Sequence, residues 1–331
     1  MRRRYLAIAL AIGLTALWAA VCMADVPAAK TLPPELAALY AYDNTAALNV
    51  TVSDTKDSAK TVEERIEFDS TKGGRVTGLF IRPKAVAKPG VILALHGLGM
   101  NKDFARPLAA FLADKGYAVL GLDAALHGDR KVPGKEMFGD IDSTSAAMVQ
   151  TIVDYRRAMD YLAMRKDVRS EAFGLIGVSM GAIQGTIVAA VDQRVASSLL
   201  VVGGGDWSKF AAGSTRPEAA AMKALLQNPA VAAEAAKFDP MTFAPFLSPR
   251  PAWFVNGRQD TVIPVEAAKA LQEAAGEPKR IIWYDGDHIP PIPVALQAMN
   301  EWAAQALQPA LDKAAAVQGA AGGASQDCEG K

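Results

Sequence analysis

The stretch Gly177-Val178-Ser179-Met180-Gly181 decides the fold of this 331-residue chain. It follows a short apolar run at 173–176 and precedes a run of mainly small and apolar residues at 181–191, so it predicts a buried strand that turns sharply into a helix. Such a turn strains the serine backbone and exposes its Oγ, and glycines must flank it because a Cβ would collide with the neighbouring strand and helix. This context favours Ser179 as a nucleophile over a bystander in a tight turn.

Strands and helices alternate on both sides of this turn, which is the signature of an α/β sheet covered on both faces. Residues 206–248 break the rhythm with Ala-rich helical pieces. The predicted fold is therefore one α/β domain at 63–307, a mostly parallel twisted sheet with helices on both faces and a small helical cap inserted at about 206–248. Strands are expected at 63–69, 75–82, 91–95, 117–122, 172–178, 195–202, 251–256 and 280–284.

Both ends of the chain are predicted to lie outside this domain. Three arginines at 2–4, an apolar run at 5–20 and small residues before position 25 are typical of a signal peptide, residues 1–24, cleaved after Ala24. The alternative is an uncleaved anchor, because 5–23 is nearly long enough to span a bilayer. We expect an N-terminal extension at 25–62 and a disordered Ala/Gly-rich tail at 308–331. A cleaved signal predicts a periplasmic or secreted protein without stable membrane insertion.

The composition excludes several functions. The 35 basic and 35 acidic side chains balance, so no long-range field is available to hold a nucleic acid. With two cysteines and three histidines, the chain has too few residues for a disulfide framework or a Cys-rich zinc module. We therefore expect no metal and no nucleic-acid partner, and we expect no organic cofactor because a serine nucleophile needs none.

The three histidines differ in their place along the chain. His96 directly follows a predicted buried strand, so its expected role is to fix the loop that follows; His127 lies in a loop after the next strand, where a structural or rim position is expected. His288 follows the last strand, at the sheet edge where α/β proteins place their sites. A serine hydroxyl needs an adjacent base to become nucleophilic, and imidazole suits that work at neutral pH. His288 is therefore the candidate base for Ser179.

Three motifs together resemble those of the α/β-hydrolase family over residues 63–307. They are the Ser179 turn, the Leu-His-Gly-Leu-Gly turn at 95–99, and the pair Gly-Arg-Gln-Asp at 257–260 with Asp-Gly-Asp-His at 285–288. The order serine, aspartate, histidine is the order of that family. The resemblance implies a catalytic triad of Ser179, Asp260 and His288. It also implies an oxyanion hole made by the backbone N–H groups of Leu98 and Met180.

The acid has two candidates. Asp260 lies one loop beyond a strand and shortly before Pro264, which opens the next helix, so it can be held near the histidine. Asp206 follows the preceding predicted strand, where some members of the family carry their acid. We favour Asp260 and retain Asp206 as the alternative.

Departures from other branches narrow the expected function. There is no His-Gly-Gly-Gly run, and the nucleophile is serine, which disfavours hormone-sensitive-lipase-like enzymes, haloalkane dehalogenases and dienelactone hydrolases proper. Asp239-Pro240 and the Gly257-to-Asp260 spacing look more like esterases and oligopeptidase-like enzymes, but the length leaves no room for a propeller. We expect an exported serine hydrolase that cleaves small carboxyl esters, with short acyl groups, through an acyl-enzyme on Ser179. The alternatives are a peptidase or amidase of the same fold and a non-catalytic binding member.

Overall fold

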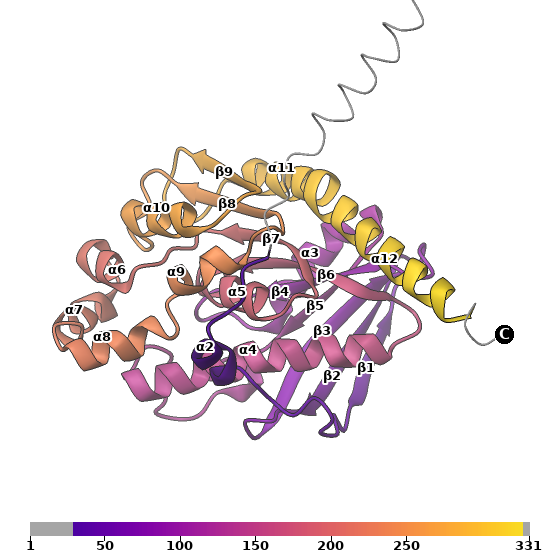
Figure 1. Ribbon diagram of the computed structural model, residues 1–331, viewed down its shortest axis with the longest axis horizontal. Coiled ribbons are helices and arrows are strands. Elements are labelled where there is room, and N and C mark those ends of the chain that lie inside the picture. The colour runs from indigo at the N-terminus through magenta and orange to yellow at the C-terminus, as the bar shows by residue number, and fades with distance from the viewer. Residues whose placement is uncertain (1–28, 327–331) are drawn as a thin grey trace, which may run out of the picture.

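The computed structural model describes residues 29–326, with side chains up to residue 319. The described chain forms a nine-stranded sheet in the order β1-β2-β3-β5-β4-β6-β7-β8-β9 (Figure 1). The three neighbouring pairs from β1 through β2 and β3 to β5 are antiparallel. All neighbouring pairs from β5 to β9 are parallel. The strands are β1 Thr51–Asp57, β2 Thr61–Asp69, β3 Arg75–Pro83, β4 Gly90–Leu95, β5 Tyr117–Leu122, β6 Arg169–Val178, β7 Val195–Val201, β8 Ala252–Gly257 and β9 Lys279–Tyr284.

Helices cover both faces of the sheet, and each face has its own apolar layer. Along β4, Leu93 packs into the layer beneath α4, α5 and α10, whereas Ile92 packs into the layer beneath α3, α11 and α12. Side chains of a strand alternate between faces, so a strand buried on both sides reads as a continuous apolar run. The predicted fold class is confirmed. The helices are α2 Pro34–Leu39, α3 Ala105–Leu112, α4 Ile141–Met164, α5 Met180–Val191, α10 Val265–Ala274, α11 Ile292–Trp302 and α12 Gln308–Gln326.

Residues 206–248 lie between β7 and β8 and carry four short helices, α6 Trp207–Gly213, α7 Pro217–Leu225, α8 Pro229–Ala236 and α9 Pro240–Phe243. Three of them begin with proline, whose missing N–H costs nothing at a helix start. The carboxylate of Asp239 ties the segment together, because it accepts hydrogen bonds from the backbone N–H groups of Asp206, Trp207 and Met241. We call residues 206–248 the cap.

The sheet begins earlier than the sequence predicted. Strand β1 lies within the segment that was expected to be an N-terminal extension, and it pairs with β2 at the edge of the sheet. All seven of its side chains are exposed, so its sequence shows no alternation of buried and exposed positions. Without that alternation, an edge strand of polar residues cannot be distinguished from a loop.

The prediction of a disordered tail is wrong over 308–326, where the chain forms α12. This helix continues from α11 through a π-helical turn, Ala303–Leu307. Leu311 is only 2% exposed, and the phenolic O–H of Tyr117 donates a hydrogen bond to Gln308. Packing against the body therefore orders a helix whose own composition gives no apolar stripe.

The predicted signal peptide, residues 1–24, lies outside the described residues, as do the last five positions, 327–331. Among the helices within 29–326, none is long and apolar enough to cross a membrane.

Candidate active site

Ser179 lies at the turn between β6 and α5, in a backbone conformation with φ of 54° and ψ of −118°. Few non-glycine residues adopt a positive φ, so the turn holds this serine under strain. A Cβ at Gly177 would overlap the carbonyl of Gly181, and a Cβ at Gly181 would overlap the carbonyl of Leu95 on β4. Both glycines are therefore required for the close approach of helix and strands that the sequence pattern predicted.

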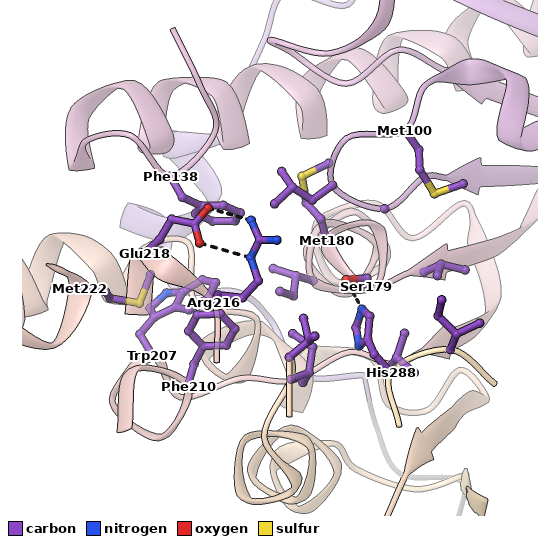
Figure 2. A pocket seen from close by; sticks show the side chains of 18 of the residues that line it. Met100, Phe138, Ser179, Met180, Trp207, Phe210, Arg216, Glu218, Met222 and His288 are labelled. Atoms are coloured by element: carbon purple, nitrogen blue, oxygen red, sulfur yellow. Dashed lines mark hydrogen bonds and ion pairs between the residues drawn. The ribbon is translucent and has the colours of Figure 1, made fainter. Parts of the chain in front are cut away.

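The structure brings Ser179, His288 and Asp260 together, and Figure 2 shows Ser179 and His288 of this group. Nε2 of His288 lies 2.9 Å from Oγ of Ser179, and Nδ1 lies 2.9 Å from Oδ2 of Asp260. With Nδ1 donating its proton to the carboxylate, Nε2 is left as the acceptor for the serine hydroxyl. The three side chains follow β6, β9 and β8 and meet because the carboxyl ends of these parallel strands share one edge of the sheet.

The Asp260 carboxylate is buried and fixed by the start of the next helical segment. Its Oδ1 accepts hydrogen bonds from the backbone N–H groups of Val262 and Ile263, both at 2.9 Å, which turns Oδ2 toward His288. Gly257 lets the loop that carries His288 approach the end of β8 closely, because a Cβ at Gly257 would overlap the carbonyl of Asp287. The rival acid, Asp206, instead caps α6 and pairs with a lysine on that helix.

The two residues expected to supply the oxyanion hole, Leu98 and Met180, line the same cavity as Ser179. Met180 is the first residue of α5, and the first N–H groups of a helix have no acceptor within it. Leu98 lies in the loop after β4, and Met100 closes that loop with a hydrogen bond to the Gly97 carbonyl. Both residues thus lie beside the serine, and their role as the oxyanion hole stays a prediction.

His96 holds this loop against the loop that follows β5. Its Nε2 accepts a hydrogen bond of 3.1 Å from the Ala124 N–H, and Nδ1 lies 2.8 Å from the Gly97 carbonyl oxygen, so the proton is on Nδ1. Burial lowers the pKa of His96 to about 4. His127 is buried beside it, with Nδ1 3.0 Å from the Ala125 carbonyl, a structural position rather than one at the serine.

The lowered pKa of His96 predicts a loss of stability in acid. The unfolded chain takes up the proton at the ordinary value of 6.5 and the folded chain at about 4, so stability is full above pH 6.5 and falls as the pH drops toward 4. The loss attributable to this group is at most about 3 kcal/mol. Urea unfolding at pH 7 and pH 4 should show a larger stability difference for the wild type than for His96→Gln, which cannot titrate. Equal pH dependence in the two proteins would contradict this assignment.

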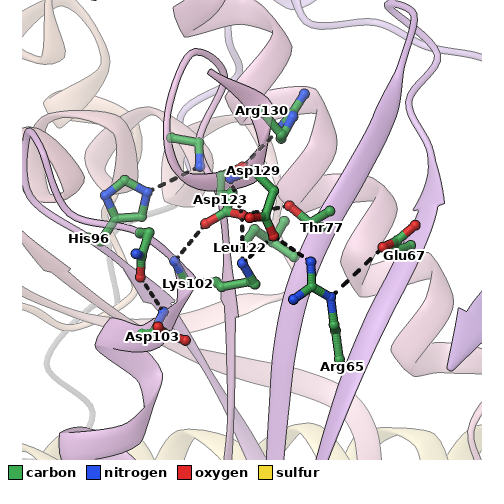
Figure 3. A network of polar contacts seen from close by, with 12 residues as sticks. Arg65, Glu67, Thr77, His96, Lys102, Asp103, Leu122, Asp123, Asp129 and Arg130 are labelled. Atoms are coloured by element: carbon green, nitrogen blue, oxygen red, sulfur yellow. Dashed lines mark hydrogen bonds and ion pairs between the residues drawn. The ribbon is translucent and has the colours of Figure 1, made fainter. Parts of the chain in front are cut away.

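A buried ion pair also anchors the loop that follows β4 (Figure 3). The Asp123 carboxylate is fully buried and accepts hydrogen bonds from the Thr77 hydroxyl, at 2.6 Å, and from both the backbone N–H and the ammonium of Lys102. Burial alone would raise the pKa of Asp123, but these hydrogen bonds hold it below its ordinary value. Lys102 also contacts Asp129 at 2.6 Å, so the loops after β4 and β5 are fastened together.

A cavity of about 500 Å³ opens above Ser179, between the body and the cap. Its walls are mainly apolar, which is typical of a binding site for a small organic ligand. Sequence reasoning missed Arg216 and Glu218, a charged pair from the cap that lines this cavity, because no motif surrounds them. Over the part of the chain that is described, no group of three or more His, Cys, Asp or Glu side chains is placed to hold a metal ion. The cap contributes Trp207, Phe210, Arg216, Glu218 and Met222, and the body contributes Phe138, Ile183, Ile263, Ile289 and others.

A family model and curated relatives match parts of the chain. Residues 90–217 match the family model described as the alpha/beta hydrolase fold. The chain is 26% identical over 156 residues to the protein YtaP of Bacillus subtilis (strain 168), covering 42% of this chain and 52% of that protein. It is also 26% identical over 234 residues to the uncharacterized protein YfhR of Escherichia coli (strain K12), covering 68% and 73%. The chain thus spans about half the length of the first relative and more of the second.

Among solved structures, the acetyl xylan esterase from Paenibacillus sp. R4 superposes with a TM-score of 0.69 at 20% identity, covering 81% of this chain and 91% of that one. The chain therefore has the α/β-hydrolase fold, and the resemblance recognised from its motifs is confirmed.

Proposed function

We propose that this protein is a serine hydrolase that cleaves carboxyl esters through an acyl-enzyme on Ser179. The observation that carries the proposal is the continuous hydrogen-bonded chain from Ser179 Oγ through His288 to Asp260, at the floor of an apolar cavity. Nucleophile, base and orienting acid in this geometry are the parts that acyl transfer needs. An acetyl xylan esterase is among the solved structures that share the fold, which favours an ester as the substrate class.

The proposed reaction runs in two halves. Ser179 Oγ attacks the ester carbonyl while His288 Nε2 takes its proton, and Asp260 stabilises the imidazolium that forms. The N–H groups of Leu98 and Met180 hold the oxyanion. His288 then gives the proton to the departing alcohol. Water, activated by the same histidine, attacks the acyl-enzyme and frees Ser179.

The cavity predicts a preference for short acyl groups. It is roofed by residues of the cap and has a volume of about 500 Å³. Hydrolysis of p-nitrophenyl esters should therefore peak at acyl groups of about two to six carbons and show no jump in rate above the critical micelle concentration. Interfacial activation on a long-chain triglyceride would instead show that the cap opens as a lipase lid.

We further propose that the protein is exported and acts in the periplasm or outside the cell. The proposal rests on the basic, apolar and small-residue order of residues 1–24. N-terminal sequencing of the protein recovered from the extracytoplasmic fraction should begin at Asp25. Recovery of the full-length chain in the cytoplasm would contradict it.

A further inference from the structure

One charged pair lies in a cavity whose other lining residues, apart from Ser179 and His288, are mainly apolar. Arg216, just before α7, donates hydrogen bonds from Nη2 and Nε to the two oxygens of Glu218, at 2.7 and 3.2 Å. Both side chains line the cavity that holds Ser179 and are partly exposed, by 37% and 31%. Figure 2 shows two nitrogens of the guanidinium facing Glu218 and the third, Nη1, directed away from it. Across the residues that the structure describes, Nη1 has no protein acceptor.

The charge of this pair is already balanced. Burial alone would raise the pKa of Glu218, but hydrogen bonds from its backbone and from Arg216 hold it below the ordinary value, so the carboxylate is ionised at neutral pH. An anionic ligand at Nη1 would add a second negative charge beside Glu218 among aromatic and methionine side chains, where an uncompensated charge is costly. A neutral oxygen acceptor would satisfy Nη1 without that cost.

The position of His288 indicates which part of an ester lies near Arg216. His288 must protonate the leaving alcohol, so the alcohol lies on the histidine side, where Ile289 is 84% exposed and the cavity meets solvent. The acyl group then points the other way, toward the cap, where Trp207 is only 5% exposed. Arg216 and Glu218 lie at that cap side of the cavity.

We propose that Arg216 is a specificity residue that binds a neutral oxygen acceptor, such as a keto or hydroxyl oxygen, on the acyl group of the substrate. This inference rests on the proposed esterase function and defines its substrate class. The preferred esters carry a short acyl group with a neutral keto or hydroxyl oxygen, rather than a plain alkyl acyl group or the free carboxylate of a dicarboxylic half-ester. Arg216 supplies the donor, and Glu218 keeps that donor selective for uncharged acceptors.

Three p-nitrophenyl esters of matched shape test the proposal: 5-oxohexanoate, 5-methylhexanoate and the glutarate half-ester. They place a ketone, a methyl group or a carboxylate at one position, and homologues one carbon shorter and longer vary the spacing. The rate measured with Ser179→Ala is subtracted from each rate, and this subtraction removes the contribution of uncatalysed hydrolysis. At the best spacing, kcat/KM for the keto ester should exceed that for its methyl isostere by about tenfold, the effect of one hydrogen bond to a charged donor. The half-ester should be the poorest of the three.

Two variants separate the roles of the pair. Arg216→Met should reduce the keto-to-methyl ratio to about one, whereas Lys209→Met, which removes a cap cation outside the cavity, should leave the ratio as in the wild type. Glu218→Gln leaves the guanidinium charge uncompensated, so the ratio of half-ester to methyl ester should rise at least about tenfold. This gain does not depend on how Arg216→Met folds.

The outcomes distinguish this inference from the proposed function. Hydrolysis of the methyl ester that depends on Ser179, with no keto preference at any spacing, would overturn the specificity and leave the esterase intact. A wild-type preference for the half-ester, or a keto preference that survives Arg216→Met, would overturn it equally. If no ester of the series is cleaved, the proposed function falls and the specificity with it.

Discussion

Replacement of Ser179 by alanine should lower kcat for a short p-nitrophenyl ester by about a millionfold, because the three residues act as a unit and the reaction loses its nucleophile. The fold should survive, since the substitution removes only the hydroxyl and leaves the glycines that shape the turn in place. Ester hydrolysis followed by p-nitrophenolate absorbance measures the loss, and a thermal melt checks the fold.

Ser208→Ala is the matched control, because Ser208 is exposed on α6 and does not line the cavity. It should keep wild-type turnover. Turnover near the wild-type rate in Ser179→Ala would remove Ser179 from the reaction.

Replacement of Asp260 by asparagine should lower kcat by about ten-thousandfold. Oδ1 of Asp260 accepts two backbone N–H groups, so the oxygen of an asparagine would keep that place and its NH₂ would face Nδ1 of His288. Nδ1 would then have to accept, which places the proton on Nε2 and blocks transfer from Ser179. Steady-state kinetics with the same ester measure the loss.

Asp206→Asn is the comparison for the acid. Asp206 caps α6, and asparagine caps helices equally well, so this variant should change kcat little. A large loss in Asp206→Asn with little change in Asp260→Asn would move the acid to the loop after β7. Comparable losses in both would show a shared network.

The fold was predictable where local pattern and burial agree. Strand β4 is buried on both faces and its sequence is a continuous apolar run, so a strand is the direct prediction. Strand β1 and helix α12 carry no such pattern, since β1 is exposed along its length and α12 is rich in alanine and glycine. Helix α12 is ordered by contacts with a distant part of the chain, such as the hydrogen bond between Tyr117 and Gln308, and β1 is ordered by its pairing with β2 at the edge of the sheet.

The candidate site, too, could be predicted from the sequence only in part. The surroundings of Ser179 are contiguous in sequence, and His288 was one of only three histidines, so each could be weighed from its place in the chain. Arg216 and Glu218 could not be assigned in this way. They lie on the cap, and whether their side chains face the cavity depends on how the short helices of the cap pack. Nothing in the sequence Arg216-Pro217-Glu218 distinguishes a pair that faces a cavity from a solvated one.

Ser179 is proposed as an activated nucleophile, and covalent labelling is the direct test of that role. A fluorophosphonate reacts with a serine only where a base has activated it, and it forms a stable adduct that peptide mapping by mass spectrometry locates. A single adduct is expected, on the peptide that contains Ser179, with no adduct in Ser179→Ala. An adduct on another residue, or ester hydrolysis that persists in fully treated protein without label on Ser179, would contradict it.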